Sequence, residues 1–381
     1  MRTLWLRWGS LPLIFLLVFF PSFNVFAQTA SVAGGAAASE PVLRGAAKKK
    51  KSSPRRRGRV RYTVSSYGNP TASDSEEGED PSVREVAARA LGKLNGSVMV
   101  VEADTGRVLT IVNQKLALSA GFKPCSTIKL AVSLAALEEE LITGDTLVPL
   151  SRRESLNLTE ALAYSNNPFF EILGERLGFK KVSAYARLLG FGELAGYLIE
   201  DEYPGSFPTQ PPRHGGVGRL ASFGEAVKVT PLQLAALMAA FANGGTLYYL
   251  QYPRTEEERI EFRPRVKRHL PIQRWLPELR AGMEAAVLYG TARVSAEAEE
   301  HILGKTGTCG EERAKLGWFA SYGELPAGAR LVVVVLLRGG RILGGAKAAE
   351  VAAQVYRGLS QTYAPADHAE EVADPAPAGG N

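Results

Sequence analysis

Apolar residues in this chain follow a strand-like period near both ends of one long segment and a helical period between them. Residues 97–103 and 107–112 are β-rich and are joined by Asp104-Thr105-Gly106, a sequence typical of a hairpin turn. Helical spacing is expected at 83–94, 126–141, 159–177, 181–189, 231–243 and 346–359, and three more strands at 302–308, 315–322 and 329–337. Strands from both ends around a helical block predict an α+β fold: an antiparallel sheet flanked by N- and C-terminal helices, plus an all-helical subdomain.

The segment that can fold is bounded by two stretches without apolar periodicity. It is expected at residues 81–364, and a chain with 45% hydrophobic and 22% charged residues can bury a sizeable core. Residues 28–80 are rich in Ala, Gly and Ser, then basic, then acidic, and residues 365–381 are rich in Ala, Pro, Gly and acids. Both compositions are typical of disorder, so we expect a disordered linker before the domain and a disordered tail after it.

The first 27 residues resemble a secretory signal peptide. Arg2 and Arg7 precede the apolar stretch Leu11 to Phe20, and Val25-Phe26-Ala27 offers a small residue at the cleavage point. The alternative is an uncleaved anchor, since the apolar region is nearly long enough to span a bilayer. Either interpretation predicts an exported chain, in the periplasm or at the outer face of the cytoplasmic membrane.

Positive charge is concentrated in one short tract. Ten Lys and Arg residues and no acid lie between Arg44 and Arg61, whereas the whole chain has a net charge of +6. The simplest interpretation is a solvated tether. A sharper one is contact between Lys48 to Arg61 and an anionic envelope surface, such as lipid head groups or wall polymers. Nucleic acid is not an expected partner of an exported chain.

The residue types restrict the available chemistry. The four histidines are scattered, and the two cysteines have no histidine nearby, so neither a histidine-based triad nor a zinc site is expected. No metal and no cofactor are predicted. Lysine is therefore the available general base. Ser126 and Lys129 form an S-x-x-K pair at the start of an expected helix, where residues three apart share one face. A lysine kept neutral by burial could take the proton of that serine.

Two further motifs follow in order. Ser165-Asn166-Asn167 is an S-x-N sequence, which could supply a hydroxyl for proton transfer and an amide for holding a substrate. Lys305-Thr306-Gly307-Thr308 lies on an expected strand, where a cation and hydroxyls could bind a carboxylate while the strand edge pairs with an extended peptide. Each motif alone is weak, but the order of the three in an exported chain is specific.

With these motifs the sequence resembles the penicillin-binding protein transpeptidase family, which belongs to the same superfamily as the serine β-lactamases. The resemblance covers about residues 96–360 and implies the β-lactamase/transpeptidase-like fold. Further matching segments lie around the third motif: Ala221-Ser222-Phe223-Gly224, Val229 to Ala235, Ala242 to Gly245, Gly282-Met283, Gly290-Thr291-Ala292 and Gly317-Trp318-Phe319-Ala320.

By this resemblance Ser126 is the acylated nucleophile, Lys129 is its base and Ser165 relays protons toward the leaving group. The implied substrate-binding residues are Asn167, Lys305, Thr306 and Thr308, and the backbone N–H groups of Ser126 and Thr308 would form the oxyanion hole. The implied partners are peptidoglycan stem peptides ending in D-Ala-D-Ala and β-lactams.

The leading hypothesis for function is a D,D-transpeptidase or D,D-carboxypeptidase that acts through an acyl-serine intermediate. The alternative is a serine β-lactamase, although Glu154 to Asn157 lies before the second motif and is one residue shorter than the E-x-x-L-N signature of class A enzymes. We interpret that segment as the approach to the helix from residue 159. A non-catalytic penicillin sensor is a third hypothesis, disfavoured by the complete set of catalytic residues.

The only two cysteines, Cys125 and Cys309, flank the first and third motifs. An even count in an oxidising compartment favours pairing. In the family fold the third-motif strand lies against the start of the serine helix, so the resemblance implies a disulfide, as in class A carbapenem-hydrolysing enzymes. The alternative is two reduced thiols in contact. Cys125 also departs from the family, in which a glycine usually precedes the serine.

Overall fold

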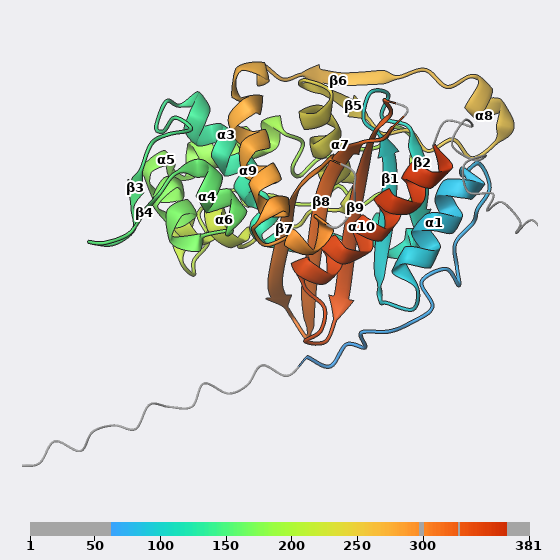
Figure 1. Ribbon diagram of the computed structural model, residues 1–381, viewed down its shortest axis with the longest axis horizontal. Coiled ribbons are helices and arrows are strands. Elements are labelled where there is room, and N and C mark those ends of the chain that lie inside the picture. Colours follow the sequence, from blue (N-terminus) through green and yellow to red (C-terminus); the bar gives the residue numbers. More distant parts are fainter. Residues whose placement is uncertain (1–61, 297–300, 327, 364–381) are drawn as a thin grey trace, which may run out of the picture. The chain divides into compact units, whose positions relative to one another are not determined.

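The computed structural model describes residues 62–296, 301–326 and 328–363. At its centre lies one five-stranded antiparallel sheet in the order β2-β1-β9-β8-β7 (Figure 1). The strands are β1 (Gly96–Glu102), β2 (Val108–Val112), β7 (His301–Glu311), β8 (Ala314–Glu324) and β9 (Arg330–Gly339). Two strands come from the beginning of the domain and three from its end, which confirms the predicted α+β fold and its sheet built from both ends of the chain.

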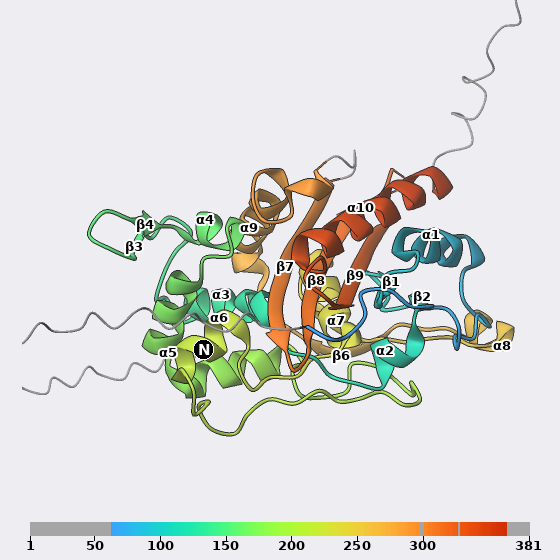
Figure 2. The ribbon, with the colours of Figure 1, turned by 90° about the horizontal axis from the view of Figure 1, so that it is seen from below.

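Two helices cover one face of the sheet. They are α1 (Pro81–Leu91) and α10 (Gly345–Thr362), and Figure 2 shows both on one side of the strands with α7 (Pro231–Ala242) on the other. The central strand β9 alternates between these layers: Val333 and Val335 pack with α1 and α10, whereas Val332 and Val334 pack on the α7 side. A strand buried on both faces needs apolar residues throughout, which explains its unbroken hydrophobic sequence.

The helical subdomain extends from the α7 face of the sheet beyond β7 (Figure 1). Its helices are α3 (Lys129–Glu138), α4 (Leu158–Ala163), α5 (Asn167–Leu188), α6 (Gly216–Phe223), α7 and α9 (Leu276–Leu288). Every residue of α7 is buried. As the sequence predicts, Thr230 caps α7 and Pro231 begins it; Thr230 and Gln233 form a reciprocal capping box.

Short elements connect these layers. They are α2 (Gln114–Leu118), α8 (Glu256–Ile260), the 3₁₀ turns η1 (Cys125–Ile128), η2 (Gln273–Trp275) and η3 (Arg293–Ser295), and the strand pairs β3 (Val148–Pro149) with β4 (Ser155–Leu156) and β5 (Thr246–Tyr249) with β6 (Arg265–His269).

The helix expected at 159–177 is divided in the structure, whereas the break expected between it and the helix at 181–189 is present at Gly178, within the range of α5. α4 ends at Ala163 and α5 begins at Asn167, because Asn166 accepts a hydrogen bond from the Phe169 N–H and Pro168 occupies the first turn. Gly178, with φ of 74° and ψ of 163°, is non-helical and separates two helical parts of α5, as the sequence predicts. The break between α4 and α5 matters because the second motif lies in it.

The predicted linker boundary at residue 80 is too late, because residues 62–80 are part of the folded domain. Asp74 accepts hydrogen bonds from the backbone N–H groups of Asn113 and Gln114 and forms an ion pair with the buried Arg84. Glu79, also buried, accepts bonds from the Ile111 N–H and the Tyr252 hydroxyl. These acids look like solvated charges in the sequence, but they satisfy buried donors that lie far away in the sequence.

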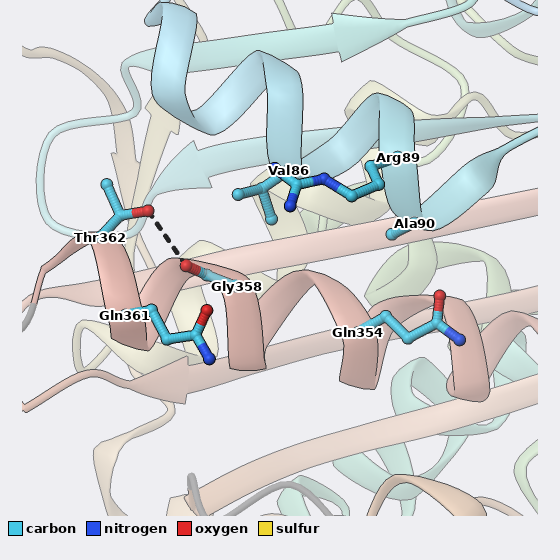
Figure 3. A pocket seen from close by; sticks show the side chains of 7 residues that line it. All are labelled: Val86, Arg89, Ala90, Gln354, Gly358, Gln361 and Thr362. Carbon is cyan, nitrogen blue, oxygen red and sulfur yellow. Dashed lines mark hydrogen bonds between the residues drawn. The ribbon is translucent and has the colours of Figure 1, made fainter. Parts of the chain in front are cut away.

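A groove remains between α1 and α10 (Figure 3). It is lined by Val86, Arg89, Ala90, Gln354, Gly358, Gln361 and Thr362, none of which belongs to the three motifs. At Gly358 the helices are close, since a Cβ there would lie 2.6 Å from Val86 Cγ1. The predicted signal peptide, the basic tract Lys48 to Arg61 and the tail from 365 lie outside the described residues. Within those residues no helix is both long and apolar enough to cross a bilayer.

Candidate active site

The first motif lies in a tight turn that leads into α3. Ser126 is in η1 and Lys129 is the first residue of α3, so the serine is one turn before the helix proper. Cys125 adopts a left-handed conformation, with φ of 51°. This conformation favours glycine, and it costs a cysteine on the order of 1 kcal/mol or more.

Lys129 is fully buried, and its Nζ is surrounded by oxygen atoms from two motifs. The amine lies 3.2 Å from Ser126 Oγ, 3.1 Å from Ser165 Oγ, 2.6 Å from the Ser165 carbonyl oxygen and 2.7 Å from Asn167 Oδ1. The structure therefore brings together the four residues that the sequence assigned to the first two motifs.

The types of these oxygens determine what the amine can do. The Ser165 carbonyl and Asn167 Oδ1 can only accept hydrogen bonds, so they take up both N–H groups of a neutral lysine. The lone pair then remains for a hydroxyl, and Ser126 Oγ is within hydrogen-bond distance. This is the arrangement that a general base needs toward its nucleophile.

Burial also favours the neutral amine. Desolvation, reinforced by the positive charge of Lys305, lowers the pKa of Lys129 to about 6, while Glu171 acts in the opposite direction. At neutral pH most Lys129 side chains are therefore unprotonated and able to accept a proton.

The second motif is positioned by the break between α4 and α5. Ser165 has a φ of 55°, a left-handed conformation that turns both its carbonyl oxygen and its Oγ toward Lys129 Nζ. Asn166 caps α5, which leaves Asn167 in the first turn with its amide oxygen on the same amine. Backbone strain of this kind is often concentrated at functional sites.

The third motif lies on β7, an edge strand of the sheet. Lys305 is fully buried and donates to the Thr306 carbonyl oxygen at 3.2 Å, and burial lowers the pKa of Lys305 to about 7. Thr306 is buried and its hydroxyl is 2.6 Å from that of Thr291. The Thr308 hydroxyl is exposed and accepts the Gly345 N–H at 2.7 Å, so its proton is free to donate.

A disulfide between Cys125 and Cys309 links the first and third motifs, with the two Cα atoms 5.5 Å apart. It joins residues adjacent to Ser126 and Thr308, whose backbone N–H groups are the expected oxyanion donors. The two motifs pack closely at Gly307, where a Cβ would lie 3.0 Å from the Pro124 carbonyl oxygen. The bridge closes a loop of 184 residues, for which chain-entropy arguments allow roughly 5 kcal/mol as an upper figure.

Several contacts in the site were not assigned from the sequence. Thr291, noted only within a matching segment, orients Thr306. The Phe170 ring lies 5.3 Å from Lys129 Nζ, and Glu171 acts on the charge of that lysine. Phe170 and Glu171 follow Asn167 by three and four residues, and this helical spacing is the sequence pattern from which their place beside the site could have been predicted. Glu154, considered for a β-lactamase signature, is exposed before α4, and Asn157 caps that helix, as we interpreted the segment.

Comparison of the sequence with known proteins agrees with this geometry. The sequence model of the family described as penicillin binding protein transpeptidase domain matches residues 96–357. Stage V sporulation protein D of Bacillus subtilis (strain 168) is 31% identical over 224 residues, 52% of this chain and 34% of that protein. Peptidoglycan D,D-transpeptidase FtsI of Escherichia coli (strain K12) is 25% identical over 361 residues, 81% of this chain and 59% of that protein. The chain thus spans between a third and three-fifths of these curated relatives.

Solved structures share the fold. The transpeptidase domain of penicillin-binding protein 3 from Burkholderia pseudomallei gives a TM-score of 0.63 at 21% identity, covering 75% of this chain and 96% of that one. The D,D-transpeptidase domain from Eggerthella lenta gives 0.58 at 19% identity, covering 74% of this chain and 82% of that one. With the family match extending over most of the described domain, from β1 to α10, the chain belongs to the penicillin-binding protein transpeptidase domain family.

Proposed function

We propose that this protein is an acyltransferase of peptidoglycan, acting on stem peptides that end in D-Ala-D-Ala through an acyl intermediate on Ser126. The observation that carries the proposal is the convergence of Ser126, Ser165 and Asn167 on the buried amine of Lys129. The same chemistry makes β-lactams covalent inhibitors, because their strained amide can acylate the same hydroxyl.

In the acylation step, Ser126 Oγ attacks the carbonyl carbon of the penultimate D-alanine while Lys129 Nζ takes the hydroxyl proton. Negative charge develops on the carbonyl oxygen, where the backbone N–H groups of Ser126 and Thr308 would receive it. Donors fixed in advance at that point lower the barrier by about 3 kcal/mol each. The disulfide beside them limits their relative movement.

Breakdown of the tetrahedral intermediate requires a proton on the leaving D-alanine amine. Ser165 Oγ, 3.1 Å from Lys129 Nζ, provides a path for that proton. Lys305, while protonated, and the free proton of the Thr308 hydroxyl suit the terminal carboxylate of the substrate. An acceptor amine then attacks the carbonyl carbon of the acyl-serine, and the steps of acylation run in reverse: the amine loses its proton through the same groups, and Ser126 Oγ regains one as it leaves.

Cross-linking is the form of this reaction that we favour over simple hydrolysis. One relative that matches 81% of this chain is named a peptidoglycan D,D-transpeptidase. Carboxypeptidase activity differs only in that water replaces the acceptor amine, so the same residues serve both reactions.

The proposed location is outside the cytoplasm, through the signal peptide at residues 1–27. The disulfide supports this location, since such bonds persist in oxidising compartments. We also propose that the basic tract Lys48 to Arg61 contacts an anionic envelope surface, on the basis of its charge alone.

Slow hydrolysis of the penicilloyl enzyme is the first expected result. Among the residues that the structure describes, the Ser126 hydroxyl is bonded to the amine of Lys129 and to no carboxylate that could activate water, so the acyl-enzyme should persist. A chromogenic cephalosporin mixed with the protein should give a burst of one equivalent per chain, followed by little turnover. Sustained turnover of many equivalents per second would instead assign the protein to the serine β-lactamases.

A further inference from the structure

A carboxylate lies on the helix face that holds the catalytic amine. Glu171 follows Asn167 by four residues on α5, so the two side chains share one face of the helix. Asn167 Oδ1 accepts from Lys129 Nζ at 2.7 Å, and the ring of Phe170 lies 5.3 Å from the same atom. Two residues of this face, Asn167 and Phe170, therefore lie directly against the amine of Lys129, and Glu171 is their neighbour on the same face.

The position of Glu171 is fixed by a neighbouring helix. Ser222 of α6 is fully buried, and its hydroxyl lies 3.2 Å from Glu171 Oε1 and 2.9 Å from the Gly218 carbonyl oxygen of its own helix. α6 also packs against η1, the turn that carries Ser126. Glu171 is thus held between the helix that carries Asn167 and the helix that supports the nucleophile.

The charges that act on Lys129 come from two elements. Lys305 on β7 disfavours the protonated amine, and Glu171 on α5 favours it. The next carboxylate along α5 is that of Glu175, and its side chain, like that of Glu171, lies close to Gly218 of α6. Arg219 of α6 pairs with Glu225 instead.

We propose that Glu171 is a positioning residue for the reaction, whose fixed carboxylate stabilises the ammonium that Lys129 becomes when it takes the proton of Ser126. The inference rests on the acyl-serine mechanism proposed above. In that step the Ser126 O–H bond breaks and an N–H bond forms on Lys129, so a cation appears in a buried site where water cannot solvate it. Glu171 itself takes no part in the proton transfer.

The test is Glu171→Gln, which removes the charge while its amide oxygen can still accept from Ser222. Glu171 raises the pKa of Lys129, so this pKa should be lower in the variant than in the wild type. The low-pH limb of the acylation-rate profile should therefore move to lower pH. The maximal rate should fall on the order of tenfold, since a less basic amine is a weaker general base. The rate of penicillin acylation, measured by stopped flow across pH, gives both quantities.

Two matched variants separate charge from structure. Glu175→Gln removes an exposed carboxylate one turn further along α5 and should leave both the low-pH limb and the maximal rate as they are in the wild type. Glu171→Asp keeps the charge and should restore the limb toward the wild-type position. If Glu171→Gln is folded and its limb coincides with that of the wild type, the proposal is overturned.

A readout without chemistry distinguishes this inference from the proposed function. The titration of Lys129 can be followed by NMR in protein labelled with ¹³C at the lysine ε-carbon, with the signal assigned by its loss in a Lys129→Met variant. We expect a lower midpoint in Glu171→Gln, even if the wild type proved unable to acylate. An unchanged midpoint would refute the role of Glu171, whereas absent acylation would refute the proposed function.

Discussion

Replacement of Ser126 by alanine should abolish covalent labelling by penicillin. The wild-type chain should gain one penicilloyl group on Ser126, the hydroxyl at the turn that leads into α3, which lies 3.2 Å from the amine of Lys129. Removal of that Oγ removes the proposed nucleophile, so the expected effect is complete loss. Intact-mass spectrometry of the two proteins after exposure to a fluorescent penicillin measures it.

A control serine shows that the loss is specific. Ser119, exposed at the C-terminal end of α2, can be changed to alanine with no expected effect on labelling. A penicilloyl group on any residue other than Ser126, found by peptide mapping of the folded wild type, would refute the assignment of the nucleophile.

Replacement of Lys129 by alanine should slow acylation by about 10²–10⁴-fold, the usual effect of losing a general base. Binding should suffer less, because Lys305 and Thr308 remain to hold the substrate carboxylate. Lys181→Ala, a surface lysine paired with Glu139, is the matched control and should acylate at the wild-type rate. An acylation rate in Lys129→Ala within a few-fold of the wild type would rule out this lysine as the base.

The same lysine predicts the pH dependence of acylation. Burial lowers the pKa of Lys129 to about 6, so the neutral, active form gains population as the pH rises through about 6. Burial lowers the pKa of Lys305 to about 7, and above that value its positive charge is lost, which weakens carboxylate binding. The rate should therefore rise to a maximum between these values and then fall. Lys129→Ala should lose the rising limb.

Local sequence spacing predicted the parts of the site that lie on one element. Ser126 and Lys129 are three residues apart, and a helical turn alone brings them together. The order of strands and helices along the chain likewise predicted the sheet that forms from both ends of the domain. These features depend on short-range periodicity and on burial, which are visible in the sequence.

Features that depend on distant partners were not predictable in this way. The left-handed backbone of Ser165 interrupts a stretch with good helical spacing, and only the contacts of its oxygens with Lys129 explain it. From the sequence, Asp74 is interpreted as part of a solvated acidic run. In the structure its side chain is buried, where it pairs with Arg84 and accepts a hydrogen bond from the Asn113 N–H. The disulfide was implied by resemblance to a family, because sequence spacing alone does not give distances between residues 125 and 309.

The most direct test of the account is acyl transfer from a peptide. The full chain is incubated with a stem-peptide analogue ending in D-Ala-D-Ala, with and without an amine acceptor, and products are identified by mass spectrometry. We predict release of one D-alanine and formation of a donor–acceptor conjugate with the wild type, and neither product with Ser126→Ala. Failure of the folded wild-type protein to release D-alanine, under conditions in which penicillin is hydrolysed continuously, would contradict the central claim.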